Sequence, residues 1–433
     1  MKNAYIIPLR EQAKVRNSWL EERFRTVLAE IMDREGFDMW IISGREYNED
    51  PVMMSMFPQP MMSARRRTIL VFYREKSEEG HQDASFSEDA VPSESCDSLE
   101  RITIARGRTD LSPMYQSVWI EGEPDEWHVL ARLVEEREPK SIGVNVSETF
   151  VFGDGLSHSE HIRLMEALGP VYRERVRSAE RLALGWLETR LPSEIWAYTG
   201  VVWSCHDIVK EGFSRKVIVP GVTTPMDVAW WMRQTMEDMG LKPWFQPSVE
   251  IQRFGGSDIS LNSPILPGDL LHCDIGFYYL GFASDIQQNA YVLKLGEDSP
   301  PSGLVSALAT GNRMQDIVMG QMQAGRTGNE ILCASLKEAK AQGIRASVYC
   351  HPIGYHGHAA GPTVGLWDHQ EGVPGRGDYQ LFNDTCHALE LNIRQEIDEW
   401  KGQEIVIALE EDIVFTGNRA YFLDGRQEEF HLV

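Results

Sequence analysis

The stretch HCDIGFYYLGFASD, residues 272–285, carries two carboxylates in otherwise apolar and aromatic surroundings. Asp274 and Asp285 are separated by eleven positions. Burying an unpaired carboxylate costs several kcal/mol or forces its protonation. The two aspartates therefore either face water or share a positively charged partner.

The segments around these aspartates predict a β-hairpin. Residues 270–277 and 283–293 are strand-like, and the turn between them is expected at Tyr279 and Leu280. An antiparallel pair folded there places Asp274 directly opposite Asp285, with Cβ atoms about 4.5–5.5 Å apart. A pair of metal ions about 3.5–4 Å apart would fit between them. For this pair alone, a solvated edge hairpin with two unrelated aspartates is an equally good interpretation.

A glycine-rich loop, CHPIGYHGHAAGP at residues 350–362, adds His351, His356 and His358. One loop histidine is usually ordinary, whereas three within eight residues favour metal ligation or proton transfer.

Three glutamates stand in strand-like segments further along the chain. Glu390 lies in CHALELNIR (386–394), and Glu410 and Glu411 lie in IVIALEEDIVFT (405–416). Singly, each is best interpreted as an exposed strand residue. Two Asp, one or two His and two Glu together predict a carboxylate-rich dinuclear metal site.

At these residues the sequence resembles the pita-bread metallopeptidases, which include aminopeptidase P, prolidase, methionine aminopeptidase and creatinase-like proteins. The family orders its metal ligands Asp, Asp, His, Glu, Glu, with the aspartates eleven apart. The resemblance implies five metal ligands: Asp274, Asp285, His351, Glu390 and Glu410. Glu410 is preferred to Glu411 because the last family Glu stands three residues before an apolar run, here residues 413–416.

The resemblance leaves two registers open for the histidine loop. The family pattern His-x-x-Gly-x-x-x-His fits His351, Gly354 and His358. In this preferred register His351 binds metal and His358 contacts the substrate. In the alternative register, His358 is the metal ligand.

The resemblance also implies the chemistry. Asp285 and Glu410 would bridge two divalent ions, Asp274 would chelate one, and His351 and Glu390 would hold the other. Glu390 and His358 are the expected catalytic residues. Glu390 would carry a proton to the leaving amine, and His358 would donate to the developing oxyanion. Oxygen-rich donors favour Mn²⁺, with Co²⁺, Fe²⁺ or Zn²⁺ as alternatives.

Several residues depart from the family pattern. Gly256 and Ser257 stand where many members have a third histidine, and Gln288 and Ala408 stand where arginines are common. His272 either compensates for the missing histidine or, as we expect, is a neutral structural residue. Metal binding is therefore better supported than the identity of the substrate.

The elements that must position these residues form two expected domains. The resemblance implies an α+β fold: an N-terminal α/β creatinase-type domain (1–178) and a pita-bread (creatinase/aminopeptidase) catalytic domain (179–433). In the first, apolar periodicity predicts a helix over 17–35, ended by Gly36, and strands at 37–43, 67–73, 100–105 and 141–146. The polar, acidic segment 76–98 is predicted to be a solvated loop or hairpin extension.

The second half contains an internal repeat. A helix is expected over 191–213, and residues 220–240 resemble residues 324–343. Each copy has Gly, a Thr two residues later, an acidic residue in the first helical turn, and a closing Gly. Thr224 with Asp227, and Thr327 with Glu330, are capping-box-like helix starts. The repeat favours two αβ halves related by a pseudo-twofold axis.

Composition limits the class of protein. The chain of 433 residues is 42% hydrophobic and 25% charged, as in globular proteins, and has no apolar run long enough to span a membrane. A formal charge of −23 argues against a nucleic-acid partner. Six scattered cysteines are expected to be reduced thiols of a cytoplasmic protein. An exported form that has lost a signal peptide stays open.

Three functions are compared. The preferred one is an Xaa-Pro aminopeptidase or related exopeptidase that cleaves small peptides, expected as a homodimer or higher homo-oligomer by analogy with the family. The others are a metal-dependent hydrolase or lyase of a non-peptide molecule and a metal-free binding module. Retention of all five ligand types argues against the last, because idle carboxylates in apolar strands are costly.

Overall fold

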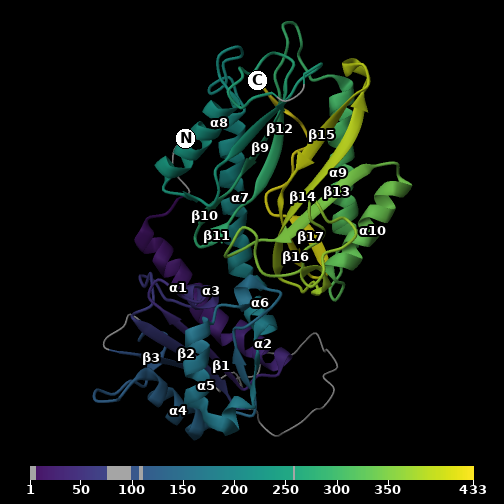
Figure 1. Cartoon of the computed structure of the whole chain (residues 1–433). Coiled ribbons are helices and arrows are strands. Elements are labelled where there is room, and N and C mark those ends of the chain that lie inside the picture. Colours follow the sequence, from purple (N-terminus) through teal and green to yellow (C-terminus); the bar gives the residue numbers. More distant parts are fainter. Residues whose placement is uncertain (1–5, 76–98, 107–110, 257–258) are drawn as a thin grey trace, which may run out of the picture. The chain divides into compact units, whose positions relative to one another are not determined.

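The computed structural model of the chain describes residues 6–75, 99–106, 111–256 and 259–433 (Figure 1). Its described residues divide into two compact units: those within 9–187, and those within 188–433 together with residues 6–8. The sequence placed the boundary at 178/179. Segment 76–98 and Ser257, both named above, lie outside the described residues.

The unit of residues 9–187, the N-terminal unit, is built on a six-stranded mixed sheet in the order β4-β3-β2-β1-β5-β6. Its strands are β1 (Met39–Arg45), β2 (Arg67–Arg74), β3 (Leu99–Ala105), β4 (Gln116–Ser117), β5 (Ile142–Val144) and β6 (Val176–Ser178). Its helices are α1 (Leu9–Arg25), α2 (Val27–Glu35), α3 (Pro51–Ser55), α4 (Glu126–Arg137), α5 (His158–Arg173) and α6 (Glu180–Glu188).

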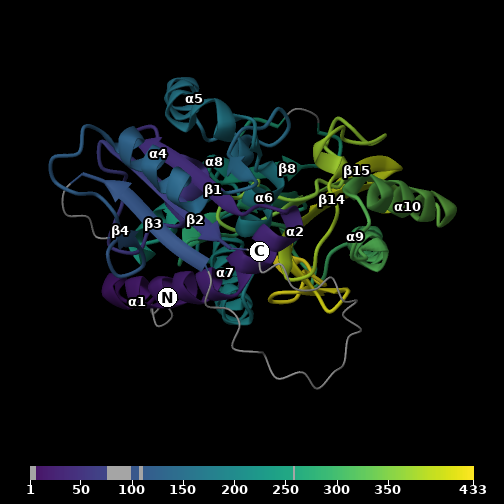
Figure 2. The same ribbon diagram turned by 90° about the horizontal axis from the view of Figure 1, so that it is seen from below.

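Helices cover both faces of this sheet, α4 and α5 on one side and α1 on the other (Figure 2). Met39 and Ile41 of β1 pack with residues of α4 and α5, whereas Phe72 of β2 lies 5.7 Å, between ring centroids, from Phe24 of α1. Burial on both faces explains why these strands read as continuous apolar runs.

The sequence predictions for this unit are largely confirmed. The four predicted strands are β1, β2, β3 and β5, with ends that differ by at most two residues. The predicted extent of the helix over 17–35 was wrong, because the helical segment begins at Leu9 and is broken at Thr26 into α1 and α2. It ends as predicted at Gly36, whose φ of 75° is left-handed.

The unit of residues 188–433, the C-terminal unit, contains two main sheets. The first sheet has the order β18-β12-β9-β8; the second has the order β13-β14-β16-β17, with β15 also paired to β14. Its strands are β7 (Lys242–Pro243), β8 (Ser248–Gln252), β9 (Leu270–Ile275), β10 (Phe277–Tyr279), β11 (Phe282–Ala283), β12 (Ile286–Tyr291), β13 (Arg345–Pro352), β14 (Thr385–Ile397), β15 (Gln403–Leu409), β16 (Asp412–Thr416), β17 (Arg419–Phe422) and β18 (His431–Leu432).

Four helices flank these two sheets, which lie between them in Figure 1. They are α7 (Pro192–Gly212), α8 (Pro225–Met239), α9 (Ser302–Gln321) and α10 (Gly328–Ala341). Helices α7 and α8 contact the first sheet, and α9 and α10 contact the second. The sheets meet at an antiparallel bridge, in which the backbone N–H groups of Gln287 and Glu410 each donate to the other residue's carbonyl, at 3.0 and 3.1 Å.

The two predicted capping boxes are confirmed. Thr224 begins α8 and accepts a hydrogen bond from the Asp227 backbone, while the Asp227 carboxylate accepts one from the Thr224 backbone at 2.9 Å. Thr327 and Glu330 make the same reciprocal pair at the start of α10. Equivalent helix starts therefore precede both sheets, as the repeat predicted.

The predicted register of the Asp274–Asp285 hairpin was wrong. Asp274 pairs with Gln287, and the turn lies at Leu280 and Gly281, one residue later than expected. Leu280 and Gly281 have φ of 54° and 91°, as a type I′ turn requires, but Leu is not a usual residue at its first position. Moving the turn by one residue shifts the register by two, so Asp285 stays on the same face as Asp274 as a diagonal neighbour.

We predict opposite effects of alanine at two glycines of this unit. Gly281→Ala forces a Cβ into the left-handed region and should lower the free energy of unfolding by about 1 kcal/mol or more. Gly200→Ala, inside α7 where an added Cβ meets nothing within 4 Å, should raise it by about 0.5–1 kcal/mol through helix propensity. Urea denaturation of both variants measures the two changes, and equal effects would contradict the observed turn.

Candidate metal centre

The five predicted ligands converge where the two sheets of the C-terminal unit meet. Asp274 lies on β9 and Asp285 immediately precedes β12. His351 is near the end of β13 and Glu390 is on β14, where Tyr349 pairs with Glu390 and His351 pairs with Ala388. His351 and Glu390 are thus diagonal neighbours on one face of the second sheet.

Glu410 joins the two pairs because its backbone bridge to Gln287 places it between the sheets. Three overlapping groups have donor atoms within 4.8 Å of one another: Asp274, Asp285 and Glu410; His351, Glu390 and Glu410; and Asp285, His351 and His358. Glu411, the neighbouring glutamate, belongs to none of them.

The His351 side chain is held in one tautomer. Its Nδ1 lies 3.0 Å from the carbonyl oxygen of Pro352, which can only accept, so Nδ1 carries the proton. Its Nε2 lies 3.2 Å from Glu410 Oε1 and 3.6 Å from Asp285 Oδ2. Burial lowers the pKa of His351 and keeps the ring neutral. A lone pair therefore faces two carboxylates, an arrangement that calls for a cation between them.

The carboxyl groups of the centre lie close together, with Asp285 and Glu410 buried and Asp274 and Glu390 half-buried. Burial, and then repulsion from Glu410, raises the pKa of Glu390 to about 8. Burial also raises the pKa of Glu410 to about 8, although the amide of Gln287 opposes the shift. The pKa values of Asp274 and Asp285 lie well above the ordinary range for the same two reasons. Without a cation, these groups hold protons at neutral pH.

These donors fit divalent metal ions. Asp274 Oδ1 is buried without a hydrogen-bond partner. The carboxylate oxygens and the Nε2 lone pair of His351 form a hard donor set without thiolate, which suits Mn²⁺, Fe²⁺ or Co²⁺. Cations placed among these atoms would remove the repulsion that raises the carboxyl pKa values.

His358 lies at the rim of the same centre. Its ring is exposed and lies 4.8 Å from the His351 ring and 5.3 Å from the Trp244 ring, between centroids. Burial on one side and the nearby His351 lower the pKa of His358 to about 4, so the ring is neutral at pH 7. His356 is separate from these groups and lies near Arg190.

Gln287 was not singled out from the sequence. Its Nε2 donates to Glu410 Oε2 at 2.8 Å, and its Oε1 lies 2.9 Å from His272 Nε2. Desolvation lowers the pKa of half-buried His272, as expected for a neutral structural histidine. Strand alternation could have identified Gln287 from the sequence, because a residue two positions after Asp285 lies on the same face of the strand.

The positions that depart from the family pattern belong to none of the three donor groups. Gln288 donates to Glu411 and lies 2.7 Å from His431 Nε2. The carbonyl of Ala408 accepts from Asn289. Gly256 lies in the loop after β8. The shell around the donors is therefore neutral at the two positions where the resemblance expects arginine.

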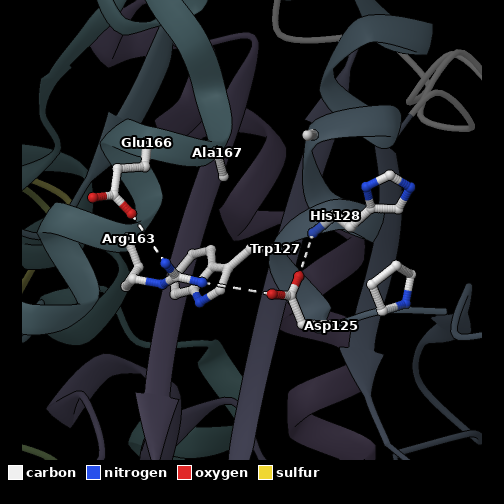
Figure 3. Close-up of a pocket in the computed structure, with 8 residues that line it drawn as sticks. Asp125, Trp127, His128, Arg163, Glu166 and Ala167 are labelled. Atoms are coloured by element: carbon white, nitrogen blue, oxygen red, sulfur yellow. Dashed lines mark hydrogen bonds and ion pairs between the residues drawn. The ribbon is translucent and has the colours of Figure 1, made fainter.

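A pocket of about 370 Å³ lies between α4 and α5 of the N-terminal unit (Figure 3). Its cation, Arg163, is already paired with Asp125 at 3.5 Å and Glu166 at 3.1 Å. Asp125 also accepts from the backbone N–H of His128, as the N-cap of α4. Because these charges satisfy one another, we assign the pocket no chemistry.

Sequence comparison identifies the family. Residues 203–417 match the model of metallopeptidase family M24, a range that includes all five donors and His358. The chain belongs to metallopeptidase family M24. The predicted resemblance to the pita-bread metallopeptidases is confirmed. Among curated protein sequences, none matches this M24 chain.

Solved structures confirm the fold of this M24 protein. The X-Pro aminopeptidase of Thermotoga maritima MSB8 has a TM-score of 0.62 at 17% identity, over 93% of this chain and 99% of its own. The Xaa-Pro dipeptidase of Bacillus anthracis has a TM-score of 0.60 at 17% identity, over 95% of this chain and 100% of its own. The N-terminal domain of the FACT complex subunit SPT16 of chickpea has a TM-score of 0.56 at 10% identity, over 95% of this chain and 97% of its own. The chain thus has the predicted pita-bread fold with an N-terminal domain.

Within the described residues of this M24 protein, no helix combines the length and apolarity needed to cross a membrane.

We predict that the metal-stripped M24 protein becomes less stable as pH rises. A carboxyl whose pKa is higher in the folded state stabilises the fold while protonated. For Glu390 this contribution is complete below about pH 4.5 and is lost as pH rises through about 8. Urea denaturation of chelator-treated protein at pH 5 and pH 8.5 should show a smaller loss in Glu390→Gln than in wild type, by about 1–3 kcal/mol.

The matched control is Glu371→Gln, which changes an exposed glutamate. Its free energy of unfolding should fall between pH 5 and pH 8.5 by as much as that of the wild type. If Glu390→Gln also shows the full fall, then Glu390 does not hold a proton in the metal-free fold.

Proposed function

We propose that this M24 protein is a metal-dependent exopeptidase of the Xaa-Pro type that acts on short peptides. One observation carries the proposal: two donor groups, one of them containing the Nε2 lone pair of His351, share Glu410 in a buried site. Membership of the M24 family supports metal-dependent peptide hydrolysis. The names of the Thermotoga and Bacillus structures support the Xaa-Pro class.

In this proposal, Asp274, Asp285 and Glu410 would hold one divalent ion, and His351 and Glu390, together with Asp285 and Glu410, would hold the other. Mn²⁺ is the first candidate. When bound, the two ions would supply a water that loses its proton near neutral pH and would stabilise developing negative charge.

The residues of the chain supply the remaining steps. His358, neutral at pH 7 and exposed beside His351, donates an N–H to the oxygen of the scissile carbonyl as negative charge develops there. Glu390 accepts the proton that the attacking water loses and delivers it to the leaving amine. Gln287 holds the Glu410 carboxylate in orientation throughout.

Arg376 favours a short substrate with a free carboxylate. Its side chain is exposed, and its charge acts on both Tyr349 and His358. Among the described residues, its guanidinium has no hydrogen-bond or ion-pair partner. A guanidinium binds a carboxylate with two parallel hydrogen bonds. Arg376 is therefore placed to bind the carboxyl terminus of a dipeptide or tripeptide that lies across the donors.

Metal analysis combined with a peptide panel tests the function. Chelator-treated protein reloaded with Mn²⁺ should bind about two ions per chain and cleave Xaa-Pro dipeptides, and chelation should abolish cleavage. Peptides with an amidated carboxyl end should react poorly. Arg376→Met should raise KM about tenfold or more for the free peptides and leave the amides unchanged, since a charge-assisted bond contributes about 1.5–3 kcal/mol.

Three outcomes would contradict the proposal. Metal stoichiometry near zero at saturating Mn²⁺ would favour a metal-free binding module. Two bound ions without peptide cleavage would favour hydrolysis of a non-peptide molecule. Equal cleavage of free and amidated peptides would remove the role proposed for Arg376.

A second prediction separates the two histidine registers. His351→Ala removes a lone-pair donor and should lower metal occupancy. His358→Ala should keep both ions and lower kcat by about 10²–10³, the scale of one lost oxyanion donor. Metal content and kcat are measured on both variants under identical loading. Loss of metal in His358→Ala, but not in His351→Ala, would show that His358 is the ligand.

A further inference from the structure

An imidazole is held between two carboxylates behind the candidate metal centre. His206, on α7, has its Nε2 2.6 Å from Glu411 Oε2 and its Nδ1 2.9 Å from Asp424 Oδ2. Ionised carboxylates only accept hydrogen bonds, so both ring nitrogens must carry protons. His206 is therefore an imidazolium, and its pKa is raised to about 10 by Glu411 and Asp424 against the opposing effect of burial.

Glu411 is fully buried, and its carboxylate is fully engaged. Oε2 faces His206, while Oε1 accepts from Gln288 Nε2 and from the backbone N–H of Gln427, both at 3.0 Å. Of the described groups that hydrogen-bond this carboxylate, only His206 is charged. The stability of the buried Glu411 charge therefore depends on His206.

Glu410 and Glu411 are consecutive residues with opposite surroundings. Glu410 faces the other donors, and its backbone is bridged to Gln287. Glu411 faces His206, and the Glu411 carbonyl accepts a hydrogen bond from the backbone N–H of Leu389 on β14. Fixing Glu411 on one side of the backbone therefore fixes the direction in which Glu410 points on the other side.

We infer that His206 is a positioning residue for the metal centre: its ion pair with Glu411 fixes that carboxylate on the side of the strand away from the donors, so that Glu410 alone faces the ions. This inference rests on the proposed function. Both His206 on α7 and Gln288 on β12 contact the Glu411 carboxylate, but only His206 carries a positive charge. Asp424 and Gln427 tie the segment after β17 to the same cluster.

The test measures metal affinity as well as activity. His206→Gln in the full chain keeps a hydrogen-bonding side chain but removes the charge and the second donor. Calorimetric titration of the chelator-treated protein with Mn²⁺ should show affinity for at least one ion lowered by 10–100-fold, the range seen for groups that orient metal ligands. The lowered kcat should recover at saturating Mn²⁺ while KM for the peptide stays unchanged.

Two companion variants keep the test informative if His206→Gln folds poorly. Asp424→Asn leaves the His206–Glu411 pair in place and should weaken Mn²⁺ binding less than His206→Gln does. The double variant His206→Gln with Gln288→Arg returns a cation to Glu411 from β12 and should restore Mn²⁺ affinity. His128→Gln, in the N-terminal unit, is the matched control and should bind Mn²⁺ as the wild type does.

The outcomes separate this inference from the proposed function. If wild-type protein binds no Mn²⁺, the proposed function fails. If wild type binds Mn²⁺ and His206→Gln binds it within twofold, even with lower thermal stability, then His206 is only structural and the inference is overturned. A double variant as weak as His206→Gln would overturn the role assigned to its charge.

Discussion

Repulsion among buried carboxylates is the constraint on which the C-terminal unit depends. Asp274, Asp285, Glu390 and Glu410 lie in overlapping groups, and burial with mutual repulsion raises the pKa of each one. Such groups remain together only if the backbone fixes them and a proton or a metal ion neutralises them. The architecture supplies the first condition, since two sheets, each backed by helices, meet where these residues lie.

The groups that contact these carboxylates and the neighbouring Glu411 are arranged in two layers. On the donor side, the Gln287 amide donates to Glu410, and the lone pair of His351 faces Glu410 and Asp285. On the far side, the positive charge is on His206, paired with Glu411. The Gln287 amide and the His351 ring are neutral, so they leave the positive charge at the donors to divalent cations. The His206 cation, paired with Glu411, reduces the total negative charge of the cluster.

Local patterns in the sequence predicted much of this unit. The donor types, the spacing of Asp274 and Asp285, and the capping boxes of α8 and α10 are short-range features, and the structure brings the corresponding residues together. The hairpin register could not be predicted from general turn preferences, because Leu280 adopts a left-handed conformation that Leu rarely takes. His206 could not be connected with Glu411 either, because 205 positions separate them and only the packing of α7 unites them.

The bridge between Gln287 and Glu410 has a kinetic consequence. The same two residues join the sheets through their backbones and orient one donor through a side-chain hydrogen bond. An ion held by Asp274, Asp285 and Glu410 would therefore be bound to both sheets, and its departure would require their separation. Metal exchange would then follow the free energy of this local opening, not the strength of any single ligand bond. Backbone amide hydrogen exchange at Gln287 and Glu410 would proceed on the same timescale as the loss of metal.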